Sequence, residues 1–120
     1  MKKIFYIVFF TFSSLSFSQD ISCSELLDFV KQNGYSSGSV DSFTMQSSWL
    51  HRVTQYSYDS MNFVVAEIKE NEYSFNTKKY IFCGVPSYNW SQFRFGGYGM
   101  SNSYGERFHD LIFPYKCDCY

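Results

Sequence analysis

The chain has 120 residues, a formal net charge of −1 and an aromatic content of 22%. This length suits one domain with a modest buried fraction, so the core must draw on the large area of its Phe, Tyr and Trp rings. The charge balance lacks the basic excess typical of proteins that bind a polyanion, and the acidic residues form no long run.

Residues 1–18 have the parts of a secretory signal peptide. A basic start precedes an apolar run over residues 4–12, and Ser16 and Ser18 place small side chains before a cleavage site at Gln19. The alternative is an uncleaved membrane anchor, but a spanning helix needs roughly 20 apolar residues. We therefore predict export to the periplasm or the extracellular space. Cleavage would leave eight Lys and Arg against eleven Asp and Glu, a net charge of −3.

The four cysteines are Cys23, Cys83, Cys117 and Cys119. An even number in a short exported chain predicts a disulfide framework. A bond between Cys117 and Cys119 would strain the preferred geometry, so Cys23 and Cys83 are each expected to join one member of that C-terminal pair. The alternatives are a thiolate metal site or a redox pair, but both usually have two residues between their cysteines. We predict no metal and no other cofactor.

Residues 19–46 are expected to form an N-terminal helix and a connector. Ser22 or Ser24 can cap a helix that runs to Asn33. Residues 35–46 are rich in Ser and Gly and are interpreted as a connector that lies on the surface of the domain.

From residue 49 the apolar pattern has a period of two, which predicts strands. These strands cover residues 50–58, 63–69 and 80–85, with a hairpin turn at residues 59–62. Sequential strands with short links are most simply antiparallel.

Two helices are expected after the strands. Pro86 suits the first position of a helix that includes Phe93, and a second helix fits residues 103–113, where Pro114 would end it. The predicted fold is α+β: a small antiparallel sheet of about three strands, covered on one face by two C-terminal helices, with an N-terminal helix and disulfide bonds.

Several short motifs follow one another in a specific order along residues 47–116. Their positions are Ser47, Ser48, Tyr58, Asp59, Tyr80, Phe82, Val85, Pro86, Ser103, Gly105, Phe108, His109, Ile112 and Tyr115. This order resembles the KTSC domain, a family named for its occurrence at the C-terminus of some lysyl-tRNA synthetases. The resemblance implies a KTSC-like domain over residues 47–120 and the RNA binding suggested for that family.

The chain departs from the family pattern in four places, one of which is a link between the second and third strands that is longer by several residues. Phe82 stands where the family has the second Tyr of a Tyr-x-Tyr motif, and His109 replaces the customary Asn. Of the usual basic residues near the end, Lys116 remains. These changes remove hydrogen-bonding groups and charge, which weakens the expectation of RNA binding.

No catalytic residue is predicted. His51 and His109 are the only histidines, and neither has an Asp or Ser at a spacing typical of a triad. His109 and Asp110 are neighbours in a predicted helix, so we expect their side chains to point to different faces.

The abundant aromatic residues allow two interpretations. Exposed rings near Arg52, Lys78, Lys79 and Arg94 could stack on bases or sugars. The interpretation that we favour places the rings of Tyr80, Phe82, Trp90 and Phe93 in the core, and we expect Phe82 to lie under the helices. The favoured function is a secreted, non-enzymatic domain that binds a protein, a glycan or a surface. The alternatives are a nucleic-acid-binding module and a small secreted toxin or hydrolase.

Overall fold

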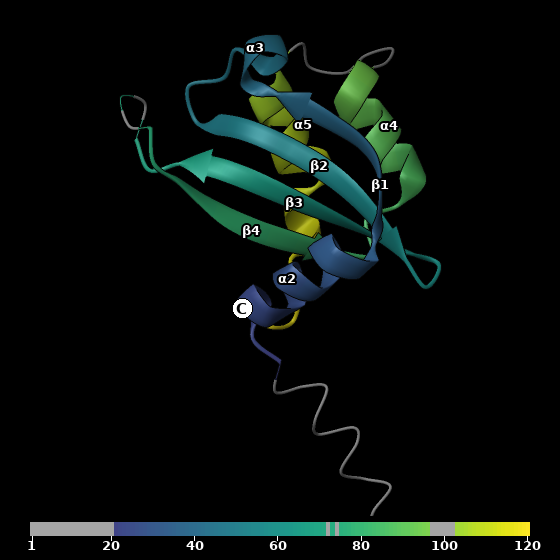
Figure 1. Cartoon of the computed structure of the whole chain (residues 1–120). Helices are drawn as coiled ribbons and strands as arrows, with labels where there is room; N and C mark the ends of the chain where they lie inside the picture. The colour runs from purple at the N-terminus through teal and green to yellow at the C-terminus, as the bar shows by residue number, and fades with distance from the viewer. Residues whose placement is uncertain (1–20, 72, 74, 97–102) are drawn as a thin grey trace, which may run out of the picture.

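The structure is a computed structural model that describes residues 21–71, 73, 75–96 and 103–120, so the expected signal peptide lies outside the described residues. A single antiparallel sheet has the strand order β1-β2-β3-β4, and helices lie on both of its faces (Figure 1). The strands are β1 Tyr35–Asp41, β2 Leu50–Tyr58, β3 Met61–Lys69 and β4 Thr77–Cys83. The helices are α2 Cys23–Asn33, α3 Ser42–Met45, α4 Ser87–Phe95, α5 Tyr104–Leu111 and the 3-10 helix η2 Phe113–Tyr115. The fold is α+β, as the sequence predicts.

Strand β1 corrects the prediction of about three strands and of a connector at residues 35–46. It pairs with β2, with Val40 opposite Val53, and α3 follows it directly. Val40 is the one buried side chain in β1. A Ser- and Gly-rich edge strand with one buried residue has little of the apolar alternation by which strands are recognised, and its partner in the sheet defines it instead.

The β2–β3 hairpin has a shorter turn than residues 59–62. Asp59 and Ser60 both have positive φ, at 52° and 66°, and Met61 already pairs with Tyr58. Two consecutive residues of this conformation match the right-handed twist of the strands they join.

The larger core lies between the sheet and the helices α4 and α5. Phe82 points to this face, is 2% exposed and meets Phe108 edge to face at a centroid distance of 5.4 Å. Trp90 and Phe93 of α4 belong to the same cluster. Phe82 is therefore buried beneath the helices, as expected.

Helix α2 covers the opposite face, which corrects the prediction that helices cover one face only. Leu27 and Val30 pack there against Phe63, Val65 and Ile81. Phe63 and Val65 face α2 because successive residues of a strand point to opposite sides of the sheet. The helix begins at a capping box, in which the Ser22 hydroxyl accepts from the backbone N–H of residue 25 at 3.1 Å.

The C-terminal helices differ in detail from the prediction. Pro86 is the N-cap of α4 rather than its first residue. Helix α5 ends at Leu111, and Pro114 lies within η2 instead of ending a helix over residues 103–113.

Arg107 is buried, and its Nε donates to the Phe93 carbonyl at 3.1 Å. This places a positive charge near the C-terminus of α4, where the helix dipole favours it.

Two disulfides connect the C-terminal residues of the chain to α2 and to β4. Cys23 is bonded to Cys119 and Cys83 to Cys117, with Cα separations of 5.2 and 5.0 Å. This is one of the two frameworks that the sequence left open. Both bonds suit an oxidising, exported environment.

The expected boundary between residues 46 and 47 separates α3 from β2, which contact one another. Among the described helices, none is long and apolar enough to cross a membrane.

Candidate functional site

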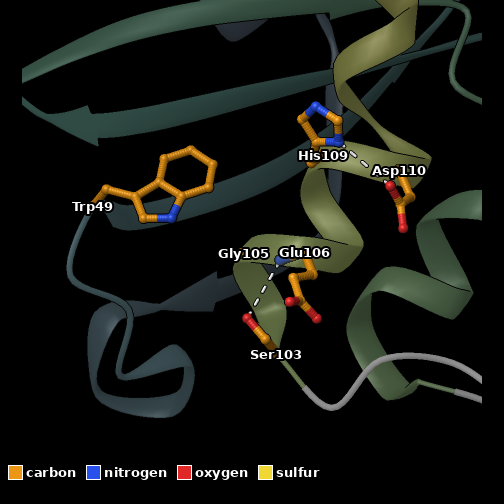
Figure 2. Close-up of a pocket in the computed structure, with 6 residues that line it drawn as sticks. All are labelled: Trp49, Ser103, Gly105, Glu106, His109 and Asp110. Carbon is orange, nitrogen blue, oxygen red and sulfur yellow. Dashed lines mark hydrogen bonds and ion pairs between the residues drawn. The ribbon is translucent and has the colours of Figure 1, made fainter.

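A surface cleft lies between the residue that precedes β2 and the exposed side of α5 (Figure 2). We call it the Trp49 cleft. It has a volume of about 480 Å³. Its lining residues are Trp49, Ser103, Gly105, Glu106, His109 and Asp110. A second hollow of about 480 Å³ shares Trp49, Ser103 and Gly105 and continues along residues 44–48.

Trp49 is held in place through its backbone and through its ring. The Ser47 hydroxyl accepts hydrogen bonds from the backbone N–H groups of Trp49, at 3.2 Å, and Leu50, at 3.1 Å. The ring meets Phe108 edge to face at 5.6 Å. A Cβ at Gly105 would lie 2.9 Å from Trp49 Nε1, so glycine allows the indole to lie against the first turn of α5. Trp49 remains 36% exposed.

The polar groups of the cleft lie along α5. Ser103 is the N-cap, and its hydroxyl accepts from the Glu106 backbone N–H at 3.3 Å. His109 Nδ1 lies 3.3 Å from Asp110 Oδ1, and both side chains are largely exposed. The expectation that these two side chains point apart was therefore wrong, because at the end of the helix they bend toward each other. Such an exposed contact contributes little stability.

Among the described residues, the hydrogen bonds do not link Ser103, His109 and Asp110 into a catalytic triad. The Ser103 hydroxyl accepts from the Glu106 backbone N–H, and the contact of His109 is with Asp110. Among the described residues, no group of three or more His, Cys, Asp or Glu side chains could hold a metal ion.

The resemblance positions divide into three groups in space. The first group lies at the Trp49 cleft, directly beneath it or in the adjoining hollow. It contains Ser47, Ser48, Ser103, Gly105, Phe108 and His109. The second group belongs to the larger core or borders it. Its buried members are Phe82, Val85 and Ile112, and its partly buried members are Tyr80 and Tyr115. Pro86 is the N-cap of α4. Tyr58 and Asp59 are at the β2–β3 hairpin.

The four basic residues considered for stacking do not converge. Lys78 Nζ lies 5.8 Å from the centre of the Tyr80 ring, whereas the Arg94 guanidinium lies 4.8 Å from that of Phe95 on α4. Arg52 and Lys79 both pair in register with Glu67, on the sheet face that α2 partly covers. They belong to a row of alternating charge across all four strands, which begins at Asp41.

Comparisons with protein-family models, with curated proteins and with solved structures found no match to this chain. The KTSC resemblance therefore stays a prediction.

Three residues of the cleft were not among the candidate site residues that the sequence indicated: Trp49, Glu106 and Asp110. One signal was available for Trp49, because it is one of two tryptophans and stands immediately before a strand. The acidic pair is spaced by four residues, which places both side chains on one side of a helix.

Proposed function

We propose that the mature protein is an exported, non-enzymatic binding domain of KTSC-like type, and that the Trp49 cleft binds a neutral glycan. The observation that carries the proposal is a partly exposed indole held against a helix that also presents hydrogen-bonding side chains. The apolar C–H face of a sugar ring packs on such an aromatic surface, while its hydroxyls need nearby polar partners.

The charge of the cleft favours a neutral ligand over an anionic one. Glu106 and Asp110 line it, and His109 is the one basic side chain among its described lining residues. Carboxylates accept hydrogen bonds from sugar hydroxyls but repel phosphate, sulfate or uronate groups. Dispersed basic residues likewise do not favour the nucleic-acid alternative.

The binding experiment uses tryptophan fluorescence. Trp90 is 5% exposed, and its Nε1 has no hydrogen-bond partner among the described residues. Trp90→Phe should therefore remove this background signal without leaving a described polar group unpaired. We expect chitotriose, a neutral oligosaccharide, to change the emission of Trp49. Trp49→Ala should weaken binding at least tenfold, as measured by calorimetry.

The matched control is Tyr88→Ala, which removes another exposed ring, from α4. It should leave chitotriose affinity unchanged, and an acidic hyaluronan oligosaccharide should bind more weakly. Equal loss in both variants, or no binding of chitotriose by calorimetry, would contradict the proposed site. Chitotriose should also be recovered intact by mass spectrometry, since cleavage would make the protein an enzyme.

Export has its own test. The proposed signal peptide predicts a secreted species that lacks residues 1–18 and has all four cysteines oxidised. Intact-mass analysis of the exported fraction, with and without reduction and alkylation, measures both properties. A full-length chain with four alkylated thiols in the cytoplasm would refute the assignment.

A further inference from the structure

A second cleft lies where β4 meets η2 and the residues that follow it, and we call it the β4 cleft. It has a volume of about 290 Å³. Its lining residues are Ile68, Tyr80, Phe82, Phe113, Lys116 and Tyr120. None of these lines the Trp49 cleft, so the two clefts are separate.

Aromatic rings form most of the wall. The Tyr80 and Tyr120 rings are 6.2 Å apart at an interplanar angle of 41°, and those of Phe82 and Phe113 are 6.3 Å apart at 49°. With Ile68 added, the surface is largely apolar. A ligand with many hydroxyl groups would lose hydrogen bonds to water here without replacing them. The cleft therefore suits a flat apolar ring better than a sugar.

The wall is held in position by bonds to the sheet. The Tyr120 hydroxyl accepts a hydrogen bond from the Ile81 backbone N–H at 2.6 Å, and Lys116 forms a β-bridge with Phe82. The disulfide of Cys119 restrains the residue beside Tyr120. Groups that are already ordered lose less entropy when a ligand binds. Burial also raises the pKa of Tyr120, so its hydroxyl stays protonated at neutral pH and can donate to a ligand.

Positive charge lies over these rings although the whole chain has a net charge of −1. Lys116 Nζ lies 5.2 Å from the centre of the Phe113 ring and 5.9 Å from that of Tyr120. Lys78 Nζ lies 5.8 Å from the centre of the Tyr80 ring. Among the described residues that line the cleft, none has an acidic side chain. Aromatic cages often bind cations, but here a second cation would be repelled by Lys116, so the charge favours an anion.

We propose that the β4 cleft binds a small aromatic carboxylate. Its ring would pack against Tyr80 and Tyr120, and its carboxylate would pair with Lys116. The cleft has a volume of about 290 Å³ and opens to solvent, which suits a ligand with one ring system and a short acidic side chain.

The first test compares ligands of matched shape by NMR titration of the oxidised protein. Phenylacetate should shift the amide signals of Ile81 and Lys116. Phenylacetamide, which has the same shape without charge, and acetate, which has the charge without a ring, should each bind at least tenfold more weakly. Phenethylamine should not bind. Equal affinity for the amide, or tighter binding of the amine, would overturn the proposal.

The second test compares two lysines. Lys116→Met keeps the apolar stem and removes the charge, so phenylacetate affinity should fall at least tenfold and the preference over phenylacetamide should disappear. Lys79→Met is the matched control, because Lys79 pairs in register with Glu67 and does not line the cleft. An equal loss in both variants would indicate only general attraction to positive charge and would refute the site. Trp49→Ala should leave phenylacetate binding unchanged, which separates this proposal from the function of the Trp49 cleft.

Discussion

At the residue scale, Gly105 controls where the indole of Trp49 lies. The position is helical, and a helix interior normally favours Ala over Gly by up to about 1 kcal/mol. A Cβ at this position would however lie 2.9 Å from Trp49 Nε1, which is closer than such contacts allow. Glycine here therefore serves the packing of Trp49 rather than the stability of the helix.

A double-mutant cycle tests this interpretation. Gly105→Ala should be neutral or destabilising in the wild-type chain, because the indole must move. In the Trp49→Ala background the same change should stabilise the fold by up to about 1 kcal/mol, since the clash is gone and helix propensity remains. Urea denaturation measures both free energies of unfolding. The same effect of Gly105→Ala in both backgrounds would show that the two residues are not coupled.

Phe82 provides a second prediction at this scale. Its ring is 2% exposed and contacts Phe108, so Phe82→Ala should lower the free energy of unfolding by about 3–5 kcal/mol. Phe75→Ala is the control, because Phe75 is fully exposed and its removal should change stability by less than about 0.5 kcal/mol. Thermal melting followed by circular dichroism compares the two. A small effect of Phe82→Ala would mean that the ring is not part of the core.

At the scale of elements, helix α2 is attached to the rest of the fold in two ways. Leu27 and Val30 pack on the sheet, and Cys23 bonds to Cys119. The other disulfide joins Cys83 of β4 to Cys117. The two bonds close loops of different length, with sequence separations of 96 and 34 residues.

Removing each bond should have a different structural effect. On the loop-entropy model, replacing Cys23 and Cys119 by Ser should cost about 4–5 kcal/mol, and replacing Cys83 and Cys117 about 3–4 kcal/mol. The first variant should also lose hydrogen-exchange protection in α2 while β2 and β3 keep theirs, because α2 is then held by packing alone. Equal loss of protection in α2 and β3 would show instead that they unfold as one unit.

At the scale of the whole molecule, the basic side chains are distributed over separate surfaces. Lys78 and Lys116 flank the β4 cleft, Arg94 lies on α4, and Arg52 and Lys79 alternate with acidic residues across the sheet. Nucleic-acid binding depends on many phosphate contacts made at once. Among the described residues we find no basic surface that extends along one face.

We therefore expect weak RNA binding. A labelled single-stranded RNA should bind with a Kd above about 10⁻⁴ M at physiological salt, as measured by fluorescence anisotropy. Arg94→Ala and Lys79→Ala should have similarly small effects because neither lies in a common site. Micromolar binding, with affinity that falls with salt at a log–log slope near −0.7 per contacted phosphate, would instead favour the RNA function of the family.

The sequence by itself determined those features that depend on neighbouring residues. Ser22, one of the two caps that the sequence offered, caps α2. Strand β2, with β3 and most of β4, follows from apolar alternation. The burial of Phe82 followed from its position in a strand that precedes two helices. These features are local, because hydrogen bonds to the nearest backbone and the two-residue period of a strand can be read over a few positions.

Only the tertiary structure decided the features that join distant segments. Strand β1 is defined by its pairing with β2, and α2 lies on the second sheet face because Leu27 and Val30 find apolar partners there. The choice of Cys119 for Cys23 likewise depends on where the chain brings α2 and the C-terminal residues together. The Trp49 cleft and the β4 cleft each combine segments far apart in the chain. A one-dimensional pattern does not encode such proximity, because it depends on how the packed elements face one another.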